Sequence, residues 1–164
     1  MPAFMDFVGP IEDQSYWEEC QKLARTLPPN ISIEVGGAFE KQEDALLRVS
    51  RSHFFVLPTL NENFGYVFIE AMSAGCPVLT SDRTVWDEIE PEELGWRIPL
   101  EDLDGWTAAI EECVRMDNES FTRMSGFARG FAVKWLANDS VALANEKVLL
   151  NALGSPIEPV DHDN

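Results

Sequence analysis

Histidine, cysteine and basic side chains are scarce in this chain of 164 residues. It has two histidines, and its 12 Lys and Arg side chains stand against 29 Asp and Glu, which gives a formal net charge of −17. With so few histidines, no Ser/His/Asp triad is expected outside the C-terminal tail. An acidic surface repels phosphate backbones and anionic lipid heads, so nucleic-acid binding is not expected. Any anionic ligand must be held by backbone amides and a few cations.

The three cysteines, Cys20, Cys76 and Cys113, each lie in an apolar pattern. Their number is odd and no C-x-x-C pair occurs, so neither a disulfide framework nor a zinc site is indicated. We therefore expect them to be small core residues.

Long hydrophobic runs are also missing. No apolar run reaches the roughly 20 residues that span a bilayer, and the N-terminus does not have the basic and apolar regions of a secretion signal. We therefore expect a cytoplasmic protein with no transmembrane segment, unless an export signal lies on sequence outside these residues. The length and the 45% hydrophobic content are those of about one globular domain.

Short apolar segments alternate with segments of helical spacing along most of the chain. The spacing predicts strands at 3–8, 31–35, 54–57, 77–80 and 96–99, and helices at 16–27, 42–49, 65–74, 103–114, 121–135 and 141–148, with a short helical stretch at 85–89. This alternation predicts a doubly wound parallel α/β sheet with a helical C-terminal cap. In such a sheet, ligands bind beyond the carboxyl ends of the strands.

Several residues are expected to serve the fold. The apolar positions of the helices, among them most of the aromatic side chains, should pack in the core. His53 borders a strand in apolar sequence and is expected to be a buried histidine. Asn118 is the expected N-cap of the helix that starts there. The polar segment from Gly154 is expected to be a frayed tail.

The strongest signal for a site follows the apolar run that ends at Leu57. Gly65 opens a predicted helix, where backbone amides and the helix dipole favour an anion such as a diphosphate. Glu62 lies in the loop before this helix, and Glu70 lies within it, with seven residues between the two. Glu70 should be roughly 8 Å beyond Gly65 at about 1.5 Å per residue. Carboxylates so spaced can accept hydrogen bonds from hydroxyls on either side of a phosphate, as in a sugar–diphosphate–ribose ligand.

This stretch resembles glycosyltransferase family 4, the group 1 glycosyl transferases, whose C-terminal halves carry a Glu-x7-Glu motif. A looser likeness covers about residues 4 to 150. The matching residues are Phe54, Val56, Leu57, Pro58, Thr59, Glu62, Phe64, Gly65, Glu70, Ala71, Met72, Ala74, Gly75, Pro77, Val78, Ser81 and Asp82.

The resemblance implies a GT-B-type fold with two Rossmann-like domains, of which the second holds a nucleotide-sugar donor. It implies that Glu70 binds the ribose hydroxyls, and that Glu62, the catalytic candidate, binds the hydroxyls of the transferred sugar. It also implies that the amides of Asn63, Phe64 and Gly65 face the sugar and the diphosphate. The segment with Ala38 and Phe39 would pass near the nucleobase. Transfer would retain the anomeric configuration and would need no metal; no cofactor is expected.

Two departures from the family pattern qualify this reading. Family members begin this domain with an earlier strand, whose loop supplies an Arg and a Lys to the diphosphate, whereas this chain opens at what would be the second strand. The N-terminal acceptor domain is not in this sequence either. We therefore expect residues 1–150 to be a nucleotide-sugar-binding domain without its first strand, residues 151–164 to be a polar tail, and the chain alone to be inactive.

Two other functions stay open: a non-catalytic sugar-nucleotide-binding or scaffold domain, and part of a GT-B-type nucleotide-sugar epimerase. The acceptor could be a carbohydrate, a lipid carrier or a protein. Asp102 and Asp104 have the Asp-x-Asp form of metal-dependent transferases but are expected to cap a helix. Arg83 is either a phosphate contact or part of a surface ion pair. The acidic 161–163 segment is not expected to hold a metal.

Overall fold

The computed structural model describes residues 1–39, 41–62 and 65–138. The predicted helix at 141–148 and the tail therefore lie outside the described residues. The strands are β1 (Ala3–Val8), β2 (Ile31–Gly37), β3 (Phe55–Leu57), β4 (Val78–Ser81) and β5 (Gly95–Ile98). The helices are α1 (Gln14–Ala24), α2 (Gln42–Val49), α3 (Tyr66–Ser73), α4 (Leu103–Arg115) and α5 (Asn118–Leu136).

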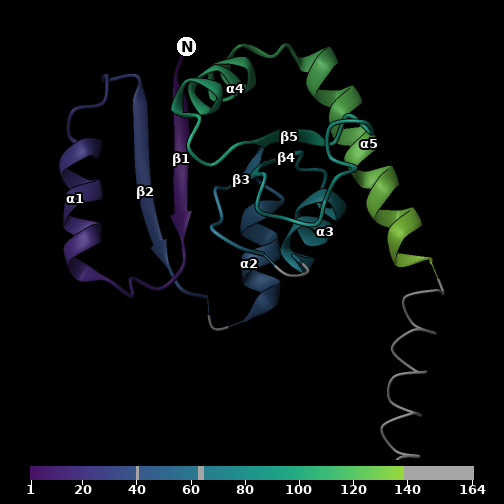
Figure 1. The fold of residues 1–164 in the computed structure, drawn as a ribbon, viewed down its shortest axis with the longest axis horizontal. Helices are drawn as coiled ribbons and strands as arrows, with labels where there is room; N and C mark the ends of the chain where they lie inside the picture. Colours follow the sequence, from purple (N-terminus) through teal and green to yellow (C-terminus); the bar gives the residue numbers. More distant parts are fainter. Residues whose placement is uncertain (40, 63–64, 139–164) are drawn as a thin grey trace, which may run out of the picture.

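All pairings between these strands are parallel, as predicted, but the strands form two sheets. β1 pairs with β2, and β3, β4 and β5 form a second sheet in that order. Figure 1 shows β1 on the side of its sheet that faces the second sheet. The alternation of strands and helices confirms the Rossmann-like α/β class. No described strand pairs with the second edge of β1 or with the second edge of β3, and the two sheets are therefore separate.

The core lies around the second sheet, where β4 is buried along its whole length. Val78 and Leu79 point to opposite faces, since side chains alternate along a strand. Val78 belongs to a cluster with α3 and α5, and Leu79 to a second cluster with α4. Helices thus cover both faces of β4, as predicted for a parallel sheet. Val56 in β3 is 38% exposed, so the covering is incomplete at that edge.

The α5 helix holds the C-terminal end of α3. Ala128 and Ala132 are fully buried, and their small side chains let α5 approach α3 closely. Ser125 Oγ donates to the carbonyl of Gly75 at 2.7 Å, and Arg129 Nη2 donates to the carbonyl of Ala74 at 3.2 Å. These bonds satisfy carbonyls near the helix end that have no intrahelical donor.

The prediction of a buried apolar face on the first helix is wrong. No residue of α1 is buried, and Tyr16 and Leu23 are 65% and 70% exposed. The first sheet has only two strands, so it offers α1 little apolar surface beyond the edge-on contact of Phe7 with Trp17.

Smaller predictions also need correction. The 85–89 stretch consists of turns because the chain closes locally, with Leu94 N–H donating to the carbonyl of Ile89 at 2.8 Å. Asn118 is the first residue of α5, and its N-cap is Asp117, whose carboxylate accepts from Ser120 N–H at 2.7 Å. His53 is exposed, with its ring against the edge of Phe121 at 5.0 Å.

The cysteines differ from one another in burial. Cys76 is 1% exposed and lies in the core, as predicted, whereas Cys20 and Cys113 are only partly buried. Burial raises the pKa of the Cys76 thiol to about 11 and is the main cause that raises the pKa of Cys113 to about 12. All three are free thiols.

Candidate functional site

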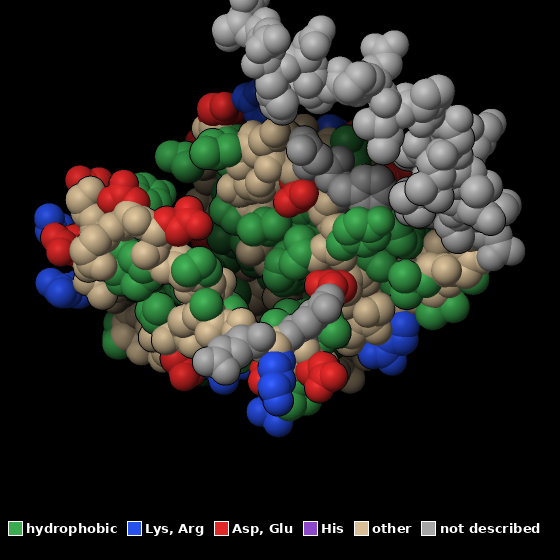
Figure 2. Space-filling model, turned by 90° about the horizontal axis from the view of Figure 1, so that it is seen from below, with side chains coloured by type: hydrophobic (Ala, Val, Ile, Leu, Met, Phe, Trp, Pro, Cys, Tyr) green, Lys and Arg blue, Asp and Glu red, His purple; other side chains and the backbone are tan. Residues whose placement is uncertain are grey.

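The loops that carry the predicted site residues follow the carboxyl ends of parallel strands. Figure 1 shows the turn after β2 and the loop between β3 and α3 at the same end of the molecule. Viewed from that end, hydrophobic side chains gather in the middle of the face, and acidic ones are scattered around them (Figure 2). The fold therefore presents two of the expected loops on one face, as predicted for a ligand site in a parallel sheet.

Glu62 is held from both its backbone and its side chain. Its N–H donates to the carbonyl of Arg83 at 3.1 Å, and Glu62 and Thr84 form a parallel β-bridge. Its Oε1 accepts from the N–H of Gly65 at 3.0 Å. The carboxylate therefore lies at the first turn of α3, where the helix dipole favours negative charge.

Gly65 is the N-cap of α3 and has a left-handed backbone, with φ 65° and ψ 46°. A Cβ at this position would lie 2.5 Å from Phe68 Cδ2 and 2.9 Å from Trp86 Nε1. Phe68 and Trp86 are 0% and 4% exposed and pack edge to face, so neither has room to move. Only glycine fits here, because a side chain would run into the buried rings that pack beneath the start of α3.

Glu70 lies in the middle of α3, on a helix whose other face is deeply buried. Phe68, Ile69, Ala71 and Met72 are at most 3% exposed, whereas Glu70 is partly exposed. The structure thus places Glu62 in the loop before α3 and Glu70 just past the midpoint of the helix. Asn63 and Phe64 lie outside the described residues, so their role stays a prediction.

The loop after β4 supplies the wall next to Glu62. Ser81 is fully buried, and its Oγ donates to the carbonyl of Thr59 at 2.6 Å. Arg83 forms ion pairs with Asp82 at 3.4 Å and with Glu101 at 2.9 Å, and its side chain is half exposed. Of the two interpretations of Arg83, the structure shows the surface ion pair.

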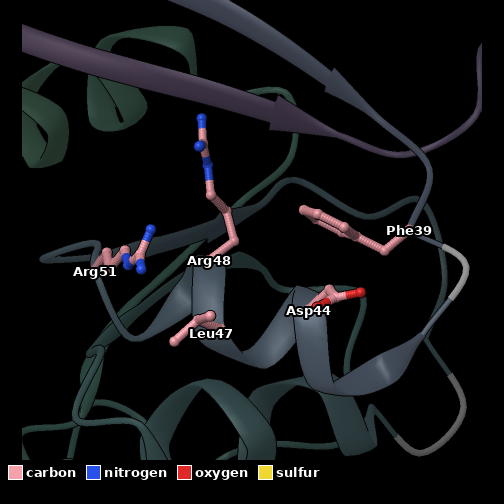
Figure 3. A pocket seen from close by; sticks show the side chains of 5 residues that line it. All are labelled: Phe39, Asp44, Leu47, Arg48 and Arg51. Carbon is pink, nitrogen blue, oxygen red and sulfur yellow. The ribbon is translucent and has the colours of Figure 1, made fainter.

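Ala38 and Phe39 follow β2. Phe39 lines a cavity of about 290 Å³ together with Asp44, Leu47, Arg48 and Arg51 of α2 and the turn after it. Figure 3 shows the Phe39 ring and the Arg48 side chain in the space between α2 and the strands of the first sheet. Arg48 pairs there with Asp6 and, at 3.0 Å, with Glu34. The expected proximity of Ala38 and Phe39 to a nucleobase stays a prediction.

Sequence reasoning missed Thr84 and Arg97 as parts of the site. Thr84 pairs with the Glu62 backbone, and Arg97 binds the carbonyl of Asp82. No local pattern marks either residue, because their roles depend on which strand ends are neighbours in the sheet. The order β3-β4-β5 brings Thr84 to Glu62 and brings Arg97 to the loop that contains Thr84.

The Asp-x-Asp motif of Asp102 and Asp104 lies at the start of a helix and caps it, as predicted. Asp102 is the N-cap of α4, and its Oδ1 accepts from the N–H of Gly105 at 3.0 Å. Within the described part of the chain, no group of three His, Cys, Asp or Glu side chains is placed to hold a metal ion. In that same part, no helix has the length and apolar character needed to cross a bilayer.

The fold is of the Rossmann-like α/β class, and Glu62 and Glu70 lie before and within α3. The sequence model of the group 1 glycosyl transferases matches residues 5–116. This match covers most of the chain, and the chain belongs to that family. No individual curated protein matches it. The transferase class therefore rests on the family match, and the match includes Glu62, Gly65 and Glu70.

Proposed function

We propose that this chain is the donor-binding domain of a retaining glycosyltransferase, which transfers a sugar from a nucleotide-sugar to an acceptor hydroxyl. Glu70 binds the ribose hydroxyls, and Glu62 binds the hydroxyls of the transferred sugar. The backbone at the start of α3 faces the diphosphate between them. The nucleotide-sugar is the substrate, and the reaction uses no metal or other cofactor.

The observation that carries this proposal is the arrangement around Gly65. α3 starts at a glycine that the packing of Phe68 and Trp86 requires, and a carboxylate stands on each side of it along the chain. A helix start offers N–H groups that have no intrahelical acceptor. In a domain with net charge −17, these amides are a local source of positive potential for a diphosphate.

The two sheets support the proposal that the domain is completed by chain outside residues 1–138. β1 and β3 each have one edge that pairs with no described strand, and β1 lies on the side of its sheet that faces the second sheet. Phe4 in β1 and Val56 in β3 expose apolar side chains. A parallel strand between these edges would join the sheets and bring its own following loop to the diphosphate.

The test of donor binding is a titration of the chain with uridine, guanosine and adenosine diphosphates and their hexose conjugates, followed by backbone amide chemical shifts. We expect shifts at Glu62, Gly65 and the first turn of α3 with at least one nucleotide. Shifts confined to the loops at the opposite ends of the strands would refute the proposed site. Absence of binding by every ligand would refute the function.

The proposal also predicts that transfer needs the acceptor domain. Holding an acceptor hydroxyl against the anomeric carbon can contribute about 7–11 kcal/mol to lowering the barrier. We therefore expect no transfer by this chain alone, and at most slow hydrolysis of the donor, when it is compared with a two-domain protein that contains it. Equal turnover by the two would show that the whole catalytic apparatus lies within these residues.

A further inference from the structure

Arg97 lies in β5, two strands away from the loop that carries Glu62. It pairs in register with Thr80 of β4, and its side chain is 29% exposed. Its Nη2 donates to the carbonyl of Asp82 at 3.1 Å and pairs with Asp87 Oδ1 at 3.2 Å. One guanidinium group thus spans the loop after β4, from its first residue to Asp87.

Asp82 makes three hydrogen bonds with the end of β5 and the residues after it. Besides the bond from Arg97, its N–H donates to the carbonyl of Ile98 at 3.0 Å. Its Oδ1 accepts from the N–H of Leu100 at 3.3 Å. The residue after Asp82 is Arg83, whose carbonyl accepts the N–H of Glu62 at 3.1 Å. The backbone that pairs with Glu62 is therefore continuous with a residue held by Arg97.

The Nε of Arg97 is buried, and no described residue bonds it. A buried donor without a partner costs free energy. The Arg97 side chain nevertheless takes this position, in which its Nη2 makes both contacts with the loop. Both contacts come from one nitrogen, and a lysine ammonium also carries several donors on one nitrogen but ends one bond shorter, so it is expected to keep these contacts only in part. The Asp87 carboxylate is 80% exposed, so the bond to the Asp82 carbonyl is the better-shielded of the two.

We infer that Arg97 is a positioning residue for the donor site. It holds the 82–87 loop, the loop holds the Glu62 backbone, and the Glu62 carboxylate is thereby kept at the N–H of Gly65. Among the described residues, the hydrogen bond and the ion pair of Arg97 go to Asp82 and Asp87 and not to Glu62. The mechanical part of this inference concerns the empty protein, and only the effect on sugar binding rests on the proposed function.

The test without ligand is amide hydrogen exchange of the whole chain, measured for wild type, Arg97→Gln and Arg97→Lys. We expect the Glu62 and Gly65 amides to exchange about tenfold or more faster in Arg97→Gln, with a smaller change in Arg97→Lys. Leu79, in the middle of β4, should keep its protection. Arg83→Gln is the matched control, because it removes a cation from the same loop but leaves the carbonyl that binds Glu62.

Unchanged exchange at Glu62 in a folded Arg97→Gln protein would overturn the inference, and so would an equal acceleration in Arg83→Gln. If Arg97→Gln does not fold, Arg97→Lys is compared with wild type in the same way. The exchange rate of the Glu62 amide must then increase more than that of the Leu79 amide.

The arm with ligand separates this inference from the proposed function. For a nucleotide whose hexose conjugate binds wild type, Arg97→Gln should weaken the conjugate about tenfold and the free diphosphate much less. Equal weakening of both would contradict an effect through Glu62. If wild type binds none of the ligands, the proposed function fails, while the exchange result still decides whether Arg97 holds the loop.

Discussion

Glu62 Oε1 accepts a hydrogen bond from the N–H of Gly65 at 3.0 Å, so the carboxylate predicted to bind a sugar also caps the helix behind it. A capping carboxylate is held in one orientation, which lowers the entropy lost when it binds a ligand. The same bond means that a substitution of Glu62 can act on the helix as well as on the ligand. Variants of this residue must keep an acceptor oxygen if the two effects are to be separated.

Glu62→Gln keeps an acceptor for Gly65 but removes the charge and replaces the second acceptor oxygen with an NH2 donor, so we expect it to spare free nucleotide and to weaken the sugar-bearing donor. Glu70→Gln should weaken both, because Glu70 is the proposed ribose ligand. A lost hydrogen bond to a charged acceptor costs about 1.5–3 kcal/mol, or roughly tenfold or more in affinity. Calorimetric titration of each variant with a diphosphate and its hexose conjugate measures this. Equal losses of free nucleotide in the two variants would contradict the separate roles.

Glu62→Ala is the companion variant, since alanine provides no cap. The loss of its hydrogen bond with the Gly65 N–H should lower the free energy of unfolding by about 0.5–1.5 kcal/mol, whereas Glu62→Gln should lower it less. Urea unfolding followed by circular dichroism gives both values. A Gln variant as unstable as the Ala variant would mean that the charge, rather than the bond to Gly65, stabilises the helix start.

Gly65→Ala should destabilise the fold for two reasons. The added Cβ would clash with two buried rings, and alanine does not favour the left-handed backbone that Gly65 adopts. We expect a loss of about 1–3 kcal/mol from strain and overpacking. Gly126→Ala is the matched control: no atom lies within 4 Å of its added Cβ, and it sits inside α5. It should stabilise by about 0.5–1 kcal/mol. Thermal unfolding of both variants tests the pair, and a neutral Gly65→Ala would refute the packing argument.

Much of this fold is predictable from the sequence, because its strands and helices are set by local patterns. The bounds of the first strand and of the helix at 42–49 agree with the structure to the residue. The Asp102 cap is likewise a local effect, between residues three apart. The site motif was predictable for the same reason, since Glu62, Gly65 and Glu70 lie within nine residues of chain.

Long-range effects were not predictable in this way. The apolar residues of α1 recur at helical spacing and a helix forms there, as predicted, but its exposure depends on how many strands lie beneath it. The surroundings of His53 and the contacts of Arg97 likewise depend on which segments meet in space. No pattern of neighbouring residues records these relationships.

Cys76 should resist alkylation at neutral pH in the folded chain. Its Sγ donates to the carbonyls of Val49 and Ser52, both at 3.1 Å, and its pKa is raised by burial from 9.0 to about 11. The protonated thiol therefore favours the folded state below about pH 9, and this contribution is lost as the pH rises through about 11. Iodoacetamide labelling with mass spectrometry should modify the partly buried Cys20 first. Labelling in denaturant is the control, and native labelling of Cys76 at the rate of Cys20 would refute its burial.

Arg48→Gln should loosen the first sheet while leaving the second intact. Arg48 reaches from α2 to Asp6 in β1 and Glu34 in β2, and its pKa is raised chiefly by the bond to Asp6. The Asp6 side chain is only 11% exposed, and its Oδ1 already has no partner among the described residues, so removing Arg48 leaves a buried carboxylate uncompensated. We expect β2 amides to exchange about tenfold or more faster, with β4 amides unchanged. Arg51→Gln is the control, because Arg51 lines the same cavity without an ion pair among the described residues. Equally faster exchange of the β2 amides in the two variants would show that the positive charge in the cavity, rather than the ion pair with Asp6, stabilises the sheet.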